Sequence, residues 1–269
     1  MNILVCVKQV PDSRDIAMDP KTGALIRSGM PGVTNPCDLY ALETALRIRE
    51  TQGGGTVTVL SMGPDQAEES LRECLSLGAD AAYLACDAAF AGSDTLATSY
   101  VLSRAVLTIE AAVGRFAVIF CGKHSSDGET AHVGPQIAEY LDRPQITGAT
   151  FADVAGETVR AGRETAAGRE VLETTCPCLI TVGKPAYEPR YPTIASILAA
   201  NRGDIVTLNA KDLNVDTGRV GLAGSPTRVA RLSPPAVKKG GRRFEGGDLR
   251  GNVAELCGLL REARAGRGG

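Results

Sequence analysis

Short apolar runs alternate with longer amphipathic stretches through the first half of the chain. The runs are rich in Val, Ile, Leu and Ala, and they predict strands at 2–8, 56–62, 79–85 and 115–121. Between them apolar side chains recur on one helical face, which predicts helices at 38–50, 64–78, 93–113 and 134–141. This β-α-β-α order predicts an α/β fold in which helices cover both faces of a parallel sheet.

The pattern changes in the second half of the chain. Residues 147–183 carry short alternating runs and glycine-containing turns, which predict antiparallel strands or hairpins added to the sheet. A loop with three prolines at 184–193 then precedes an expected short helix at 194–202 and a strand at 205–209.

The C-terminal part has a different composition. From Gly218 onward proline, glycine and arginine dominate, up to an amphipathic segment at 248–265. Such a segment is better suited to packing on a partner than to forming its own core. We therefore expect an α/β domain at 1–230 and a C-terminal arm with a helix at 231–269.

Composition narrows the function classes. The chain has 269 residues, 43 % of them hydrophobic, which excludes a disordered protein. A formal net charge of −2 argues against nucleic acid as a partner. Because no uninterrupted apolar run reaches the roughly 18 residues of a membrane span, we expect a cytoplasmic protein without membrane insertion. The eight cysteines form no C-x-x-C pair, so we expect reduced thiols and no metal site.

One stretch stands out for its chemistry, CGKHSSDGETAHVGPQIAEYL at 121–141. It begins where the fourth expected strand ends, at the edge of the sheet where ligands of such folds bind. Both histidines of the chain, His124 and His132, lie in it, but a metal site that they form with Cys121 would lack a fourth ligand. A serine nucleophile beside either histidine would lack the G-x-S-x-G elbow.

The same stretch fits an anionic ligand better. Its Gly, Ser and Thr residues let backbone N–H groups approach a phosphate, and the helix that follows offers free N–H groups and a favourable dipole. Lys123 would add a positive charge, while Asp127 and Glu129 could cap the helix or hold a ribose hydroxyl. An ordinary strand-to-helix loop with caps stays the alternative.

The chain lacks the phosphate loops of nucleotide-using enzymes. It contains neither G-x-x-x-x-G-K-[ST] nor a G-x-G-x-x-G after the first strand. The turn after that strand, VKQVPDSRD, also lacks the glycine-rich loops of dinucleotide dehydrogenases and ATP pyrophosphatases. A phosphate-transferring enzyme is therefore disfavoured, whereas a bound nucleotide that is not hydrolysed is compatible with the sequence.

Six segments of the chain together resemble the beta subunit of electron transfer flavoproteins. In family order they are VCVKQVPD (5–12), NPCDLYALE (35–43), GADAAYLA (78–85), the stretch 121–141, EPRYPTIASILAA (188–200) and DLNVDTGRVGLAGSPTRV (212–229). Glutamine is common in relatives where this chain has His124 and His132. The resemblance implies a Rossmann-like domain of the adenine nucleotide alpha hydrolase-like type. It also implies a heterodimer with an alpha subunit, which carries most of the site for the electron-transferring FAD.

The resemblance implies a nucleotide in the beta subunit as well, AMP in ordinary members and a second FAD in electron-bifurcating members. Three runs favour the bifurcating branch: SDTLATSY (93–100), TAHVGP (130–135) and GLAGSPT (221–227). A dinucleotide needs a second phosphate position, and we expect the helix start at Thr95 and Thr98 to supply it. The expected contacts with FAD, or alternatively AMP, are Cys6, Asn35, Pro36, Cys37, Asp38, Met62, Thr95, Thr98, Lys123, His124, Ser125, Ser126, Asp127, Gly128, Glu129, Thr130, Ala131, His132, Val133, Gly134, Gly224, Ser225 and Pro226.

The proline-rich loop resembles the segment by which the family docks on acyl-CoA dehydrogenases. The expected docking residues are Ala186, Tyr187, Glu188, Pro189, Arg190 and Tyr191. The family anchor is a leucine near the position of Ala186, and Tyr187, as an exposed aromatic, could serve in its place.

The function implied is an electron carrier subunit without catalytic residues of its own. It would pass electrons between a donor and a partner acyl-CoA dehydrogenase or similar flavoenzyme. Two alternatives come from other classes. A stand-alone nucleotide-binding regulatory protein would need a G-x-x-G-x9-G-[ST] loop, which the chain lacks, and a hydrolase or ligase would need the missing phosphate loop.

Overall fold

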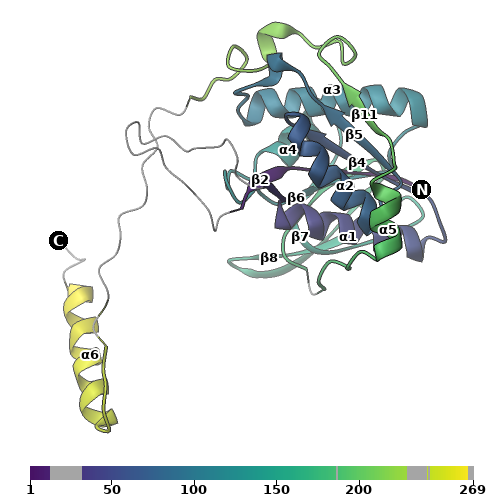
Figure 1. Ribbon diagram of the computed structural model, residues 1–269. Coiled ribbons are helices and arrows are strands. Elements are labelled where there is room, and N and C mark those ends of the chain that lie inside the picture. The colour runs from purple at the N-terminus through teal and green to yellow at the C-terminus, as the bar shows by residue number, and fades with distance from the viewer. Residues whose placement is uncertain (13–31, 186, 229–240, 242, 266–269) are drawn as a thin grey trace. The chain divides into compact units, whose positions relative to one another are not determined.

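A computed structural model describes residues 1–12, 32–185, 187–228, 241 and 243–265 of the chain. Two compact units separate within the chain, Met1–Leu232 and Ser233–Gly269, and each is described by itself. The larger unit has the predicted α/β architecture, with helices on both faces of one large sheet (Figure 1).

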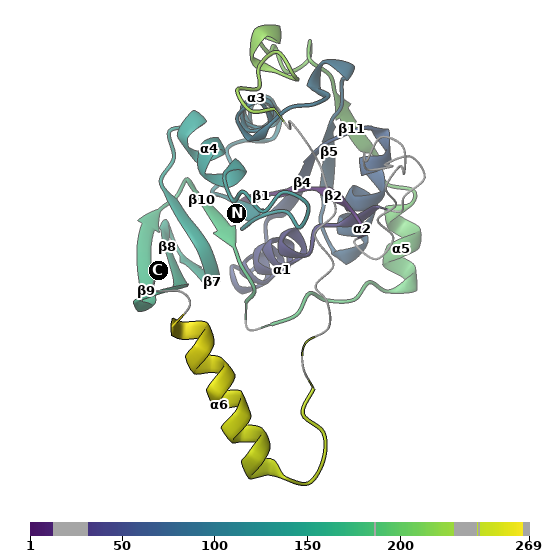
Figure 2. The same cartoon turned by 90° about the vertical axis from the view of Figure 1, so that its left-hand side faces the viewer.

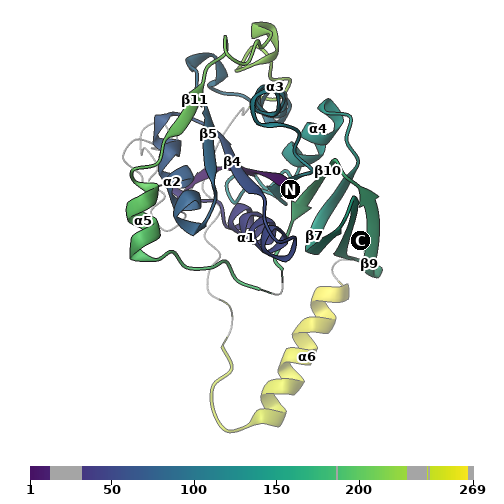
Figure 3. The same ribbon diagram turned by 90° about the vertical axis from the view of Figure 1, so that its right-hand side faces the viewer.

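The described residues of the larger unit form a nine-stranded sheet in the order β11-β5-β4-β1-β6-β10-β7-β8-β9. Neighbouring strands from β11 to β7 are parallel, and β8 and β9 continue the sheet as an antiparallel extension (Figure 3). The strands are β1 (Asn2–Val7), β4 (Thr56–Met62), β5 (Ala81–Ala85), β6 (Val118–Gly122), β7 (Gln145–Ala155), β8 (Thr158–Thr165), β9 (Gly168–Thr175), β10 (Cys178–Val182) and β11 (Ile205–Leu208).

Strand β10 corrects the expectation that residues 147–183 are antiparallel throughout. It lies between β6 and β7 and is parallel to both. All five of its side chains are buried, because the sheet is covered on both faces at this point. A continuous apolar run such as CLITV is typical of a buried parallel strand, whereas an antiparallel strand with one wet face shows alternation.

Helices cover both faces of the sheet. Those of the larger unit are α1 (Pro36–Thr51), α2 (Glu68–Leu77), α3 (Thr95–Val113), α4 (Val133–Tyr140) and α5 (Ile194–Ala200). One core cluster packs α1 and α2 on one face of the central strands, and a second packs α3 and α4 on the other (Figure 2). Short elements complete the unit, namely β2 (Gln9–Pro11), β3 (Gly32–Thr34) and the 3₁₀ turns η2 (Asp65–Ala67), η3 (Ala88–Phe90) and η4 (Thr217–Arg219).

The strand order reverses between β1 and β6. From β1 the chain moves outward through β4 to β5, and then returns to place β6 on the other side of β1. At such a reversal the following loops diverge to opposite faces of the sheet and leave a crevice beyond the strand ends. The ends of β1 and β6 are therefore where a ligand site is expected.

A buried ion pair fixes the opposite end of the sheet. Arg143, which precedes β7, donates to both carboxylate oxygens of Glu110 on α3, at 2.7 and 2.8 Å. Glu110 also accepts the N–H of Phe116 at 2.8 Å. One carboxylate thus joins α3, the turn before β6 and the entry to β7.

Helix α3 is long and apolar enough to cross a membrane by length and composition, the one such helix among the described residues. Half of its apolar window is buried within the unit, where its side chains pack on β1, β4 and β6. A helix in the core of an α/β domain has this arrangement. Such a helix can also be as long and as apolar as a membrane span.

The β8–β9 hairpin carries charges of opposite sign in facing positions. Arg163 faces Glu170, and Glu164 faces Arg169, with ion-pair distances of 2.8 and 3.3 Å. Each exposed pair contributes little stability, but together they favour this register over a slipped one.

The smaller unit is described mainly by helix α6 (Leu249–Ala265), at the place where the sequence predicts an amphipathic helix. Its apolar side chains are exposed, among them Leu249, Val253, Leu256 and Leu260. These positions recur at intervals of three and four and therefore share one helical face.

Candidate functional site

A cavity of about 770 Å³ opens at the carboxyl ends of β1 and β6. Its walls are the ends of these strands, the start of α1, the loop between β6 and α4, and the segment that runs from η3 into α3. The volume lies in the upper part of the range of roughly 300–1,000 Å³ that is usual for ligand sites. The cavity therefore has the place and the size of a nucleotide site in a Rossmann-like sheet.

Asp38, in the first turn of α1, joins the two strands at the reversal point. Its buried carboxylate accepts the N–H of Lys8 at 2.8 Å and the N–H of Gly122 at 3.0 Å. Position 122 must be glycine, because a Cβ there would lie 2.2 Å from Asp38 Oδ1. Burial raises the pKa of Asp38 to about 7, although the bonds from Asn35, Lys8 and Gly122 act in the opposite direction.

This shift predicts a pH-dependent stability. Between its ordinary pKa of 3.8 and about 7, Asp38 is protonated in the folded chain but not in the unfolded chain. Its contribution to the free energy of unfolding is therefore complete below the lower value and is lost as the pH rises to the upper one. Urea titrations from pH 4 to pH 8 should show a decline of stability that is shallower in Asp38→Asn. Parallel pH profiles of the two proteins would contradict this assignment.

Asn35 holds the β6–α4 loop in place. Its side-chain amide donates to the carbonyl of His124 at 2.9 Å and accepts the N–H of Ser126 at 3.2 Å. Its own N–H donates to the carbonyl of Lys8 at 2.9 Å. The buried Asn35 thus links the residue after β1 to two residues of the loop, through its backbone and its side chain.

The start of α4 is open towards the cavity. Its N-cap residue, His132, makes no side-chain hydrogen bond to the first turn. Glu129 and Ala131 have left-handed φ angles of 52° and 57°, which curl the loop before the helix at a cost of about 1–2 kcal/mol each. Gly134 lets the helix approach β10, since a Cβ would lie 2.5 Å from Thr181 Cγ2. The first-turn N–H groups are therefore available to an anion.

Of the two roles expected for Asp127 and Glu129, capping this helix is wrong, because the N-cap residue is His132. Asp127 instead forms an ion pair at 2.7 Å with Lys8, which lines the cavity. Burial alone would raise the pKa of Asp127, but the bonds from Lys8 and Ser125 hold it below its ordinary value. Because Lys8 is neutralised in this way, Lys123 is the cavity-lining lysine that makes no ion pair with the described residues.

The start of α3 is closed to a phosphate, contrary to expectation. Asp94 caps this helix itself, and its carboxylate accepts the N–H groups of Leu96 and Ala97 at 3.0 and 3.1 Å. The other carboxylate oxygen accepts the N–H and the hydroxyl of Thr227. A negative charge already satisfies this turn, so Thr95 and Thr98 can offer a ligand their hydroxyl groups but not a free helix end.

Most of the predicted contacts meet at the cavity. Those that line it are Cys6, Asn35, Asp38, Met62, Thr95, Thr98, Lys123, His124, Ser125, Gly128, Thr130, Ala131, His132, Val133 and Gly134. Eight others are not part of the lining: Pro36 and Cys37 in the first turn of α1, Ser126, Asp127 and Glu129 in the β6–α4 loop, and Gly224, Ser225 and Pro226 near Asp94. Ser225 accepts the N–H of Asp94 at 2.8 Å, so this last group holds the wall rather than facing the cavity.

The prediction omitted several residues of the lining. Cys86 and Asp87 follow β5, Asp65 opens η2, and Phe90 and Leu102 supply apolar surface. The rule that ligands bind beyond the carboxyl ends of parallel strands would have indicated the residues after β5.

Comparison with known proteins agrees with this geometry. The electron transfer flavoprotein domain model matches residues 22–213. An electron transfer flavoprotein subunit beta from Thermoanaerobacterium thermosaccharolyticum is 47 % identical over 91 % of this chain and 93 % of the relative. The chain belongs to the beta subunits of the electron transfer flavoprotein family. It therefore functions in electron transfer, and beta subunits of this family pair with an alpha subunit.

Relatives with other names are also similar to this beta subunit. Protein FixA from Azorhizobium caulinodans is 46 % identical over 88 % of this chain and 86 % of its own length. The caffeyl-CoA reductase-Etf complex subunit CarD from Acetobacterium woodii is 40 % identical over 97 % of this chain and 98 % of its own length. The similarity thus extends over nearly the whole chain, beyond the domain model.

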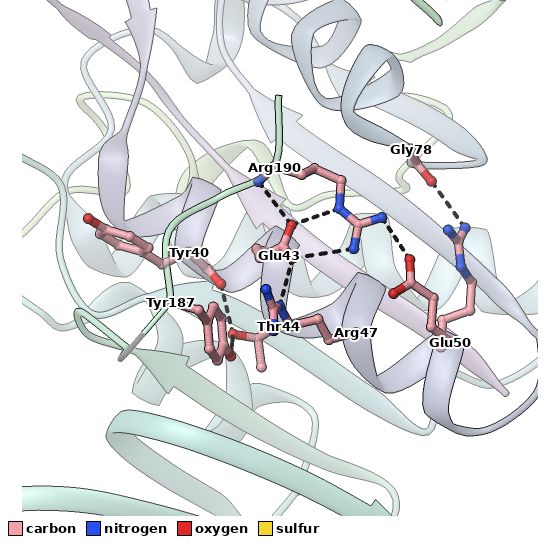
Figure 4. A network of polar contacts seen from close by, with 9 residues as sticks. Tyr40, Glu43, Thr44, Arg47, Glu50, Gly78, Tyr187 and Arg190 are labelled. Carbon is pink, nitrogen blue, oxygen red and sulfur yellow. Dashed lines mark hydrogen bonds and ion pairs between the residues drawn. The ribbon is translucent and has the colours of Figure 1, made fainter. Parts of the chain in front are cut away.

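Two of the predicted docking residues of the beta subunit, Tyr187 and Arg190, are held against α1 (Figure 4). Tyr187 is half-buried, not exposed as expected: its hydroxyl lies 2.7 Å from that of Thr44, and the Arg47 guanidinium stacks on its ring at 4.3 Å. Tyr191, by contrast, is 94 % exposed. Glu188 accepts a hydrogen bond from Tyr40, Pro189 is half-buried, and Ala186 lies outside the described residues.

Proposed function

We propose that this beta subunit binds FAD in the cavity and belongs to an electron-bifurcating electron transfer flavoprotein. The observation that supports FAD is the extent of the cavity, which continues from the β6–α4 loop past Thr98 to Phe90 and Leu102. An adenosine monophosphate would leave much of such a volume empty. The printed name of the relative CarD, a subunit of a caffeyl-CoA reductase-Etf complex, is compatible with this proposal.

The residues present fit such a ligand. Lys123 and the open start of α4 would hold the phosphates, since both offer positive charge or N–H donors. Met62, Phe90 and Leu102 supply apolar surface for a ring system. When bound, the flavin supplies the electron-accepting and electron-donating chemistry, and the chain contributes binding, orientation and electrostatics.

AMP is the second candidate, and one observation favours it. Because Asp94 closes the start of α3, the described part of the cavity has one open helix start, at α4. A single phosphate would be satisfied there. A diphosphate would share the same helix start, as in other Rossmann-like sites.

Nucleotide stoichiometry separates the two candidates. We expect the purified heterodimer to release two FAD on denaturation, one from each subunit, as measured by chromatography against flavin and adenylate standards. One FAD and one AMP per heterodimer would contradict the bifurcating assignment and leave the family membership unaffected.

Exposed apolar surfaces support two proposed partner interfaces. We propose that the exposed face of α6 packs on the alpha subunit, and that the segment around Tyr191 and α5 docks on an acyl-CoA dehydrogenase or a related flavoenzyme. Tyr191, Ile194 and Leu198 are 94 %, 80 % and 53 % exposed, which favours an interface role for such large apolar side chains.

The proposed location is the cytoplasm.

A further inference from the structure

The segment that carries these exposed side chains, Tyr187–Gly203, is held at both ends by arginine side chains. We call it the docking segment. Its helix, α5, has seven residues, and an isolated helix of that length is unstable in water. Ile194, Ile197 and Leu198 on it are exposed, so apolar burial contributes little to holding it. Its conformation must therefore depend on other contacts.

The first clamp joins the start of the docking segment to α1 (Figure 4). Arg190 donates to Glu43 through its backbone N–H at 3.2 Å, its Nε at 2.8 Å and its Nη2 at 3.3 Å. Its Nη1 donates at 2.7 Å to Glu50, which lies about two helical turns after Glu43 on α1. A planar guanidinium held by two carboxylates, with the backbone N–H of the same residue bonded to one of them, has one orientation, and the backbone next to Tyr191 is restricted with it.

Glu43 is a buried, charged carboxylate that a second arginine also binds. Its side chain is 3 % exposed, and Arg47 donates to its second oxygen at 2.7 Å. Burial alone would raise the pKa of Glu43, but the bonds from Arg190 and Arg47 hold it below its ordinary value. The carboxylate is therefore charged at neutral pH, and without Arg190 it would be left underpaired in a buried position.

The second clamp holds the other end of the docking segment. Arg72 on α2 donates through Nη1 to the carbonyls of Ala200 and Gly203 at 3.0 and 3.2 Å. These carbonyls lie at and just beyond the C-terminal end of α5, where a cation is favoured by unpaired acceptors and by the helix dipole. Thr193 and Ser196 close the N-terminal end with a capping box.

We infer that Arg190 and Arg72 are positioning residues for partner docking: they hold Tyr191, Ile194 and Leu198 in one arrangement before the partner binds. This inference rests on the proposed docking function of the segment. An interface fixed before association loses less conformational entropy on binding. If the competent arrangement falls to about a tenth of the population, the apparent affinity falls about tenfold.

The test compares Arg190→Gln and Arg72→Gln with the wild type in the complete heterodimer. The probe is a purified acyl-CoA dehydrogenase, for which the heterodimer is the electron acceptor. We expect the KM for the heterodimer to rise about tenfold with kcat unchanged. Flavin content, and the rate at which a small dye reoxidises the photoreduced heterodimer, should not change. Arg190→Lys keeps the positive charge but loses the planar guanidinium that bonds both carboxylates. Its KM should lie between those of the wild type and Arg190→Gln.

Two further variants distinguish a failure of the clamp inference from a failure of the docking proposal. Arg115→Gln makes the same chemical change at an exposed residue before β6 and should leave KM unchanged. Ile194→Glu places a charge in the proposed interface itself. A raised KM for Ile194→Glu with normal values for both arginine variants would overturn the clamp inference alone. Normal values for all three would overturn the docking proposal and the clamp role with it.

A partner-independent measurement completes the test. Hydrogen exchange of the amides in 187–203 should accelerate in Arg190→Gln and Arg72→Gln but not in Arg115→Gln. Unchanged exchange in both clamp variants would overturn the inference whichever flavoenzyme is the partner. Loss of flavin or of dye reactivity would show a general folding role and would overturn it as well.

Discussion

Replacing Glu110 by alanine should lower the free energy of unfolding by about 3–5 kcal/mol, because the change leaves a buried arginine without its counter-charge. The side chains of Arg143 and Glu110 are 3 % and 12 % exposed. The remaining donors of Arg143, Nε and Nη1, are buried and have no hydrogen-bond partner among the described residues. No second anion in the described part of the chain is therefore in place to take over, and the N–H of Phe116 loses its acceptor as well.

Urea unfolding of the heterodimer measures this loss, with Glu139→Ala on α4 as the matched control. Glu139 is exposed and has no ion pair with the described residues, so its removal should change stability by less than about 0.5 kcal/mol. The double variant Glu110→Ala with Arg143→Met should recover part of the loss, since apolar residues often replace a buried pair without a net cost. A loss below about 1 kcal/mol in the single variant would show that the pair behaves like an exposed one.

Asn35→Ala should weaken nucleotide binding about 10- to 100-fold and leave the flavin of the alpha subunit in place. The variant removes a donor to His124 and an acceptor for Ser126, together worth about 1–3 kcal/mol. Without them the loop between β6 and α4 has more conformations, and its N–H groups no longer converge on one position. Calorimetry with AMP and with FAD on nucleotide-stripped heterodimer gives the affinities.

The control for this experiment is Asn201→Ala, at an exposed position after α5 and away from the cavity lining. Asn35→Asp keeps the acceptor for Ser126 but loses the donor to His124 and adds a negative charge next to the buried Asp38. Its affinity for an anionic nucleotide should therefore be no higher than that of Asn35→Ala. Equal affinities in all four proteins would mean that the backbone alone holds the loop.

Sequence patterns predicted the parallel part of the fold well, because each strand is a compact apolar run and each helix is amphipathic. They failed at β10, where the position of the strand in the sheet depends on which faces are covered. The continuous apolar run CLITV is typical of a buried strand, but it follows three strands with alternating patterns, and its own sequence does not show which two strands it lies between. That information lies in the packing of α1 and α4 on its two faces.

The sequence predicted the position of the candidate site but not the residues that hold its loops in place. The β6–α4 loop was expected at the cavity because it follows a strand end. Asn35 and Asp38 support the site through backbone groups that lie 84 to 91 residues away along the chain: the carbonyl of His124 and the N–H groups of Ser126 and Gly122. No local sequence pattern shows such contacts. A phosphate was expected at the start of α3, where the structure instead places the carboxylate of Asp94. Tyr187 was expected to be exposed, whereas the hydroxyl of Thr44 and the guanidinium of Arg47 hold it on α1.

The β8–β9 hairpin at the edge of the sheet affects the tendency of the protein to aggregate at high concentration. Strand β9 is an edge strand, and its outer row of backbone donors and acceptors is a template on which another chain could pair. Arg169, Glu170 and Glu173 stand along that strand, on both sides of the half-exposed Val171. A second chain aligned there would have to strip water from these charges. The ion pairs that set the hairpin register thus also protect the open edge from aggregation.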